Sequence, residues 1–263
     1  MFSRKAAGTK SSIQLIGANV DTVYLVCSIN QDFNLNRIER YLILANDAAV
    51  EPVVVLSKMD CCDDPQDYVQ QVEALDPLLI VVPVNSLDPD SVRNLEPWCA
   101  AGKTVALLGS SGVGKSTLVN TLCNHTVQDT RSIRENDAKG RHTTSRRSLH
   151  LLPAGGLLLD TPGMRELQMA GCEYGVEETF TDIVELSTQC KFTDCQHVNE
   201  PGCSVQAQIC ADRLEKRRLS NYLKLMREQA FNKATLTEKR ARDRELGRFY
   251  RSVQAGKRQL YKK

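Results

Sequence analysis

The chain has 263 residues, of which 41% are hydrophobic and 25% charged, as in a soluble globular protein with one large domain and something smaller. In the sequence, no apolar run approaches the roughly 20 residues that cross a bilayer, and no apolar signal segment follows the charged residues at the N-terminus. The ten cysteines are too scattered for a disulfide scaffold. We therefore expect a protein of the reducing cytoplasm with no membrane partner.

The net charge of +2 conceals a strongly basic C-terminal segment. Residues 213–263 hold 17 Lys/Arg against 5 Asp/Glu, so the rest of the chain carries a net charge of about −10. Such a segment indicates a polyanionic partner, with Arg217, Arg218 and Lys224 among the residues expected to contact its phosphates. A solvated helical face without a partner is the alternative interpretation.

Strand and helix patterns alternate through the first 160 residues, which is typical of an α/β fold with a mainly parallel sheet covered on both faces. The expected strands are 13–16, 23–29, 52–56, 78–84, 104–108, 149–152 and 157–159, and the helices among them are 35–44, 68–75 and 116–123. The character changes beyond residue 171, where helices are expected at 180–186, 213–231 and 237–253. Because ligands of such sheets lie at the carboxyl ends of the strands, polar residues that follow these strands are candidates for a site.

The predicted strand 52–56 is followed by a candidate base-reading motif, Ser57-Lys58-Met59-Asp60. The carboxylate of Asp60 can accept hydrogen bonds from two adjacent guanine donors, N1–H and the exocyclic amine, whereas adenine presents an acceptor at N1. The stem of Lys58 can lie along the base plane. Position 57 is usually Asn in this motif, and Ser57 keeps a hydroxyl but loses the reach of an amide. Asn85 and Ser86, after the next strand, stand where a backbone N–H would meet guanine O6.

A complete phosphate loop of the form G-x-x-x-x-G-K-[ST] joins the predicted strand 104–108 to the predicted helix 116–123. The expected phosphate contacts are Gly109, Ser110, Ser111, Gly112, Val113, Gly114, Lys115, Ser116 and Thr117. Glycines allow the backbone to turn tightly and to aim consecutive N–H groups at phosphate oxygens. Lys115 supplies a charge to the β- and γ-phosphates, and the Ser116 hydroxyl is a Mg²⁺ ligand. With the base-reading motif expected at the neighbouring strand end, GTP is favoured over ATP, although a permuted ATPase remains an alternative.

The sequence Asp160-Thr161-Pro162-Gly163 closes the strand 157–159 and has the form of a nucleotide-sensing switch. We expect Asp160 to hold Mg²⁺ through water and the Gly163 amide to contact the γ-phosphate. Ras-like enzymes place a water-positioning glutamine just after this glycine. Met164 occupies that position here and cannot orient a water, so a catalytic group must come from elsewhere or hydrolysis must be slow.

The segment 126–147 is polar and basic, without an apolar period, and is expected to form a loop over the γ-phosphate. Its His142 is the nearest candidate for a catalytic group, and the alternative is an exposed loop histidine. Thr144 is the expected second Mg²⁺ ligand, with Thr143 as the next choice.

Three cysteines and a histidine within 14 residues have the spacing of metal ligands: Cys190, Cys195, His197 and Cys203. Tetrahedral Zn²⁺ takes such a set, and a short loop-rich segment gains its fold from the metal. Four protein ligands leave no open position, so we expect one structural zinc per chain. A set of unrelated reduced thiols is the alternative.

The motifs follow one another in a permuted order, because a Ras-like chain meets its phosphate loop first and its base-reading motif last. Together with the hydrophobic residue after D-T-P-G, the stretch Gly140-Arg141-His142-Thr143-Thr144 and the Cys/His set, this order resembles the RsgA (YjeQ-type) GTPases. The resemblance covers essentially the whole chain. It predicts a circularly permuted GTPase domain of α/β class at 13–171 and a helical zinc-binding subdomain at 172–263, after a linker at 1–12.

The resemblance implies a GTPase that acts late in maturation of the small (30S) ribosomal subunit, binds 16S rRNA, and leaves when GTP becomes GDP. It also implies that His142 helps to activate water and that the zinc subdomain contacts rRNA. Family members begin with an RNA-binding OB-fold barrel, for which we expect no room before residue 13, so the barrel is either lost or removed by shortening. We expect a monomer. The alternative function is a GTP-dependent RNA-binding assembly placeholder with incidental hydrolysis.

Overall fold

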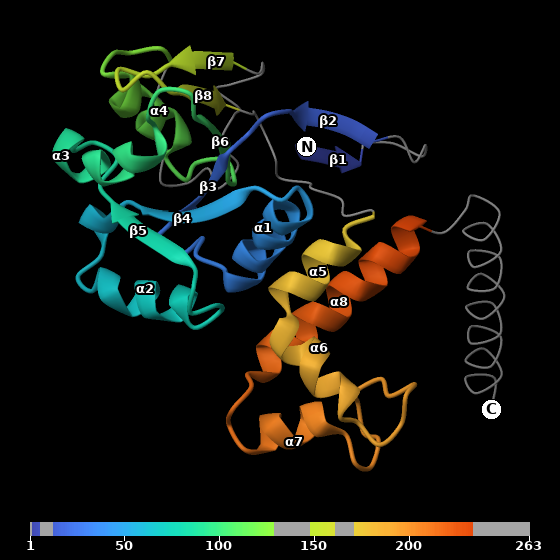
Figure 1. The fold of residues 1–263 in the computed structure, drawn as a ribbon. Coiled ribbons are helices and arrows are strands. Elements are labelled where there is room, and N and C mark those ends of the chain that lie inside the picture. The colour runs from blue at the N-terminus through green and yellow to red at the C-terminus, as the bar shows by residue number, and fades with distance from the viewer. Residues whose placement is uncertain (1, 6–12, 129–147, 161–170, 234–263) are drawn as a thin grey trace, which may run out of the picture.

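The computed structural model describes residues 2–5, 13–128, 148–160 and 171–233. Its centre is a six-stranded sheet in the order β5-β4-β3-β6-β8-β7, in which β7 is antiparallel to β8 and the other pairs are parallel (Figure 1). The strands are β3 (Thr22–Ser28), β4 (Glu51–Ser57), β5 (Ile80–Val84), β6 (Thr104–Leu108), β7 (Ser148–Leu151) and β8 (Leu157–Asp160). The predicted α/β class with a parallel-rich sheet is confirmed.

Helices cover both faces of this sheet because its inner strands are apolar on both sides. Leu25 of β3 packs toward one face, while its neighbours Tyr24 and Val26 pack toward the other. The first face is covered by α1 (Leu35–Asp47) and α2 (Pro65–Glu73), and the second by α3 (Pro89–Val92), the 3₁₀ helix η2 (Arg93–Trp98) and α4 (Lys115–Cys123).

The helices that follow β4 and β5 begin at short local signals that the periodicity did not reveal. Helix α2 starts at Pro65 rather than near residue 68, because the Asp64 side chain accepts a hydrogen bond from Gln66 N and Pro65 occupies the first turn. The same Asp-Pro pair, Asp88 and Pro89, begins α3, which was not predicted.

The predicted strand at 13–16 exists as β2 (Ile13–Gly17), but it lies outside the six-stranded sheet. It pairs antiparallel with β1 (Phe2–Lys5), which lies in the segment expected to be a linker (Figure 1). These two strands form a separate two-stranded sheet.

The C-terminal part of the described chain is helical, as expected. Its helices are α5 (Glu173–Thr179), α6 (Thr181–Thr188), α7 (Ser204–Cys210) and α8 (Lys216–Lys233), while the predicted helix 237–253 lies outside the described residues. Helix α5 packs closely on α1, since a Cβ added at Gly175 would lie 2.1 Å from the carbonyl oxygen of Ile43. Phe180 and Leu219 belong to the same buried cluster as Ile38 of α1, so the helical part and the sheet share one core.

A buried ionic network joins α8 to α1. Glu39 of α1 is fully buried and accepts hydrogen bonds from Arg217, Arg218 and Asn221 of α8. Arg218 also pairs with Asp182 at 2.7 Å; burial lowers the pKa of Arg218, but Asp182 and Glu39 outweigh it and leave that pKa raised. Because Arg218 is only 7% exposed, the prediction that it contacts phosphates of a partner is wrong.

We expect Glu39→Gln to destabilise the junction between α1 and α8. An amide would leave the buried Arg218 without one of its anions, and breaking one side of a buried pair costs about 3–5 kcal/mol. Urea unfolding of the full chain measures the loss. The control is Glu215→Gln, which removes an exposed partner of Arg217 and should cost under about 1 kcal/mol. Equal effects of the two variants would contradict the importance of the buried network.

Candidate functional site

The phosphate loop lies between β6 and α4, as predicted, with residues 109–114 in the turn and Thr117 in the first helical turn. A Cβ at Gly109 would lie 2.4 Å from the carbonyl oxygen of Val26, so β3 approaches this loop too closely for any side chain there. The ammonium group of Lys115 donates to the carbonyl oxygens of Gly109 and Ser110 at 2.8 and 2.6 Å. These bonds hold the cation at the mouth of the loop.

The base-reading motif contacts the phosphate loop directly, although the two strand ends are not neighbours. The prediction of adjacency is wrong, because β3 lies between β4 and β6. Lys58, in the left-handed region at φ 61°, reaches across and donates from Nζ to Gly112 O at 2.8 Å. Ser57 is fully buried and its Oγ donates to Val113 O at 2.6 Å. Its hydroxyl therefore ties β4 to the phosphate loop.

Asp60 and Ser86 lie at the edge of the same site. Asp60 is exposed in the 3₁₀ helix η1 (Met59–Cys61), where its Oδ2 accepts a bond from the Cys61 thiol at 3.5 Å. Ser86 Oγ is buried and has no hydrogen-bond partner in the described part of the chain. A Cβ built on Gly114 would lie 3.8 Å from this oxygen and 3.9 Å from Ser57 Oγ, so the motifs converge here.

Two supporting contacts around these motifs were not predicted. The first fixes Asn85, whose backbone N–H donates to Ser91 Oγ at 2.9 Å, while the same hydroxyl lies 3.8 Å from Met59 Sδ. Ser91 lies in α3 and belongs to no recognisable sequence motif, so no signal in the sequence points to it. Its contacts hold together the segments after β4 and β5.

The second contact supports the phosphate loop from α1. Ser110 Oγ donates to Asp32 Oδ2 at 3.0 Å and accepts from Arg37 Nη1 at 3.1 Å. Arg37 and Asp32 pair at 2.7 Å, and this hydrogen bond raises the pKa of Arg37. Only the fold brings these residues together, because Arg37 and Ser110 are separated by 73 positions in the chain.

Two of the predicted Mg²⁺ ligands lie in described residues. Ser116 is in the first turn of α4, and Asp160, only 3% exposed, ends β8 on a strand adjacent to β6. The Oδ2 atom of Asp160 accepts a hydrogen bond from Gln128 Nε2 at 2.8 Å. Oxygen ligands of this kind fit Mg²⁺. Thr144, like Thr143, His142, Gly163 and Met164, lies outside the described residues.

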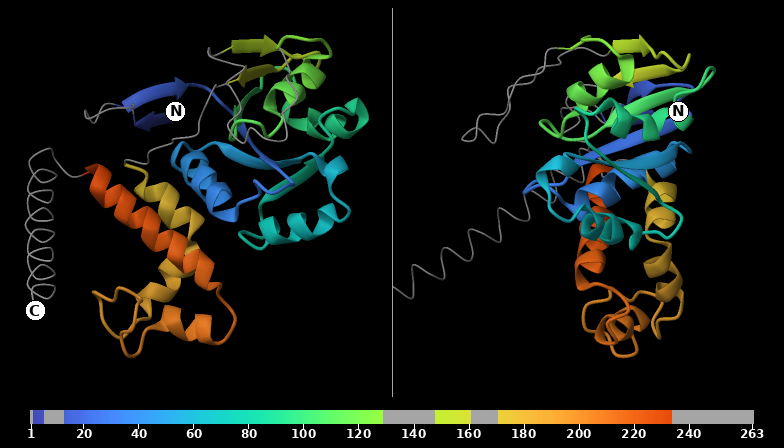
Figure 2. Two further views of the ribbon diagram at one scale, coloured as in Figure 1. Left: turned by 180° about the vertical axis from the view of Figure 1, so that it is seen from behind. Right: turned by 90° about the vertical axis from the view of Figure 1, so that its left-hand side faces the viewer.

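The four predicted zinc ligands converge on one point between α6 and α7. Their ligand atoms all lie within 4.8 Å of one another, and the Sγ atoms of Cys190 and Cys203 are 3.9 Å apart. Two thiolates on a tetrahedral zinc are separated by about 3.8 Å, given a Zn–S distance of about 2.3 Å. The arrangement is compatible with zinc. In Figures 1 and 2 this end of the helical part lies away from the six-stranded sheet.

The backbone around the cluster favours a thiolate and a tight loop. Burial raises the pKa of the Cys190 thiol, but hydrogen bonds with the backbone of Ser204 and Val205 and with the Cys203 and Cys195 side chains together outweigh it and leave that pKa lowered. The backbone N–H of Glu200 itself and those of Val198 and Gln196 lower the pKa of the Glu200 carboxyl, which also accepts a hydrogen bond from Asn199 N–H. Glu200 was missed in the sequence because only its backbone partners reveal its role.

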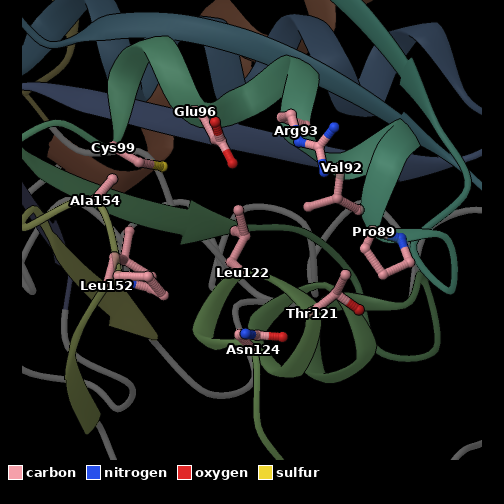
Figure 3. A pocket seen from close by; sticks show the side chains of 11 residues that line it. Pro89, Val92, Arg93, Glu96, Cys99, Thr121, Leu122, Asn124, Leu152 and Ala154 are labelled. Atoms are coloured by element: carbon pink, nitrogen blue, oxygen red, sulfur yellow. The ribbon is translucent and has the colours of Figure 1, made fainter.

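A cavity of about 220 Å³ lies elsewhere, between η2 and α4, with Glu96, Cys99, Leu122 and Leu152 among its lining residues (Figure 3). Its lining includes none of the predicted nucleotide-binding or metal-binding residues.

Among the helices of the described ranges, none combines the length and apolar character needed to cross a membrane.

The chain matches known protein families and curated proteins. The RsgA GTPase family model matches residues 1–170. An ABC transporter model also matches residues 92–260, which include the phosphate loop common to many nucleotide-binding proteins. The small ribosomal subunit biogenesis GTPase RsgA 2 of Vibrio parahaemolyticus is 60% identical over 258 residues, covering 98% of this chain and 72% of that protein. The small ribosomal subunit biogenesis GTPase RsgA of Mesorhizobium japonicum is 50% identical, covering 88% and 68% respectively.

Solved structures show the same architecture. YjeQ from Thermotoga maritima aligns with a TM-score of 0.56 and 30% identity, covering 80% of this chain and 71% of its own. YloQ, described as a circularly permuted GTPase, aligns with a TM-score of 0.58 and 27% identity, covering 82% and 70%. The family match, these relatives and the permuted order of the motifs all indicate the same family. The chain belongs to the RsgA family of circularly permuted GTPases.

Proposed function

We propose that this chain hydrolyses GTP to GDP and phosphate in late maturation of the small ribosomal subunit, which it binds through 16S rRNA in a GTP-dependent manner. The proposal rests on the convergence of the phosphate loop, the base-reading motif and Asp160 at one end of the sheet. It is supported by 60% identity to a protein named for this process. The protein would act in the cytoplasm, where ribosomal subunits are assembled, and as a monomer.

The contacts across the phosphate loop support guanine nucleotide binding. Lys58 and Ser57 attach the base-reading segment to the loop, which supports a role for Asp60 of the same segment in base recognition. We assign the guanine N1–H and amine to the Asp60 carboxylate, and O6 to the Ser86 backbone N–H. Residues 109–117 would hold the phosphates, with Gly163 contacting the γ-phosphate in the GTP state.

Two metals complete this assignment. Ser116, Asp160 and Thr144 would hold Mg²⁺, which when bound neutralises charge on the β- and γ-phosphates. Zn²⁺ would occupy the Cys190, Cys195, His197 and Cys203 cluster as a structural ion, which the ligand spacing supports.

His142 is our candidate for the residue that helps to orient the attacking water, since Met164 replaces the glutamine of Ras-like enzymes. The same Met164 favours a second candidate function, an RNA-binding assembly placeholder whose binding depends on GTP and whose hydrolysis is incidental. The two functions differ in whether the small subunit accelerates hydrolysis.

Phosphate release measured with and without purified small subunits tests the proposal. We expect the subunit to raise turnover and Lys115→Ala to abolish it, because the phosphates would lose the cation that the phosphate loop holds at its mouth. Lys103→Ala, which removes an exposed lysine near the opposite end of β6, is the control. In parallel, sedimentation with small subunits compares GDP, GTP and a non-hydrolysable analogue.

The outcomes separate the candidates. GTP-dependent sedimentation without faster hydrolysis would favour the assembly placeholder. Sedimentation that depends on neither nucleotide nor salt would contradict both, because contacts with rRNA phosphates release counterions and weaken as salt rises.

A further inference from the structure

Gln128 makes a direct contact with the predicted metal ligand Asp160. Its side-chain Nε2 donates to Asp160 Oδ2 at 2.8 Å, between residues 32 positions apart in the chain. Within the described residues, Gln128 is the one side chain that gives this carboxylate a hydrogen bond. Because Asp160 is 3% exposed, little solvent reaches its carboxylate, and an amide donor has a strong influence on its orientation.

Gln128 is held in place by Asn120 of α4. The Asn120 side-chain oxygen accepts from the backbone N–H of Val127 at 3.0 Å and of Gln128 at 2.9 Å. Its amide nitrogen donates to the Gln128 carbonyl oxygen at 2.8 Å. Three hydrogen bonds from one side chain therefore fix the backbone of residues 127–128 on the helix that begins at Lys115 and Ser116.

The two contacts form a chain from the phosphate-loop helix to the metal ligand of β8. Asn120 lies one helical turn beyond Ser116 on α4, and Asp160 ends the strand next to β6. Carboxylates that bind a metal are commonly oriented by a hydrogen bond from a neighbouring group, and loss of that group weakens metal affinity about 10–100-fold.

We propose that Gln128 is a positioning residue for the magnesium site, which holds one oxygen of Asp160 so that the other can face the metal of the bound nucleotide, and that Asn120 places Gln128 for this task. The inference rests on the proposed function, since it requires the magnesium–nucleotide site. It goes beyond the sequence motifs, because neither residue belongs to any of them. A Gln–Asp contact of this kind is built by the fold, through the return of β8 beside the phosphate loop.

The test is a magnesium titration of the full-length protein bound to a fluorescent GDP analogue. Gln128→Met keeps the length of the side chain and removes the donor, so we expect the apparent affinity for Mg²⁺ to fall about tenfold or more. Nucleotide affinity in EDTA should stay within about twofold of the parent, because the amide acts only through the metal ligand. Gln71→Met is the matched control, since Gln71 makes a similar bond to Asp67 on the exposed surface of α2.

A second variant covers the case in which Gln128→Met does not fold. Asn120→Asp keeps the oxygen that accepts from Val127 and Gln128 but removes the donor to the Gln128 carbonyl, and should weaken Mg²⁺ binding by a smaller factor. Magnesium affinity that is unchanged in both variants overturns the proposal, and so does tighter binding, which would mean that Gln128 competes with the metal. An equal loss of nucleotide affinity in EDTA and in magnesium would assign a purely structural role and also overturn it.

Measurements on the parent protein separate failure of this inference from failure of the proposed function on which it rests. If the parent binds GDP with no dependence on magnesium, the proposed metal site is itself rejected. If GDP binding by the parent depends on magnesium and GDP binding by Gln128→Met shows the same dependence, only the role of Gln128 is rejected.

Discussion

Removal of zinc is expected to unfold the segment from about residue 187 to 210 and to leave the nucleotide site intact. Structural zinc contributes apparent free energies of about 10–16 kcal/mol in small zinc-binding segments, far more than the few loop contacts there could supply. Hydrogen exchange before and after chelation should show lost protection in this segment while the strands around the phosphate loop stay protected. Binding of a fluorescent guanine nucleotide should persist.

Two cysteine variants in the same part of the chain test this prediction, one as the test and the other as its control. Cys203→Ser removes one ligand of the cluster, whereas Cys210→Ser changes an exposed cysteine of α7 outside it. The first variant should lose its metal and the second should retain one zinc per chain. Metal analysis that finds no zinc in freshly reduced, unchelated parent protein would remove the assignment. Because the zinc subdomain is expected to contact rRNA, loss of zinc should also blunt any response to the small subunit.

Asp60→Asn is expected to weaken GTP binding about 100-fold or more and to favour xanthine nucleotides. The carboxylate is assigned two charge-assisted hydrogen bonds from guanine, each worth about 1.5–3 kcal/mol. An amide replaces one acceptor by a donor that faces a guanine donor, whereas the carbonyl of xanthine at that position would accept from it. Competition between GTP and XTP for the same site measures the change in preference.

The control for this variant is Asp63→Asn, which alters an exposed carboxylate three positions further along the same segment. It should bind GTP like the parent. If Asp60→Asn also binds GTP as tightly as the parent, the base-reading assignment is wrong, and the contacts of Lys58 and Ser57 with the loop would serve only its fold. An unchanged preference against XTP leads to the same conclusion.

The sequence by itself determined the features that depend on residue type and local spacing. The phosphate loop, the Asp60 motif, the permuted order and the Cys/His set need only short stretches of chain, because their glycines, carboxylate and thiolates have few other uses in such patterns. The alternation of strands and helices in the first 160 residues identified the class of the fold. It missed the short helix α3, which begins at the cap Asp88 rather than at an apolar period, and the two 3₁₀ helices η1 and η2.

The tertiary structure decided how these parts are used. It inserts β3 between β4 and β6, and it turns Ser57 into a tie to the phosphate loop. It buries Arg218 against Glu39, although a count of basic residues places that arginine on a surface. It also brings Gln128 to Asp160, 32 positions away. Each of these outcomes depends on which distant residues share a buried contact, and burial assigns a polar group to a partner only once the layers of the fold have packed.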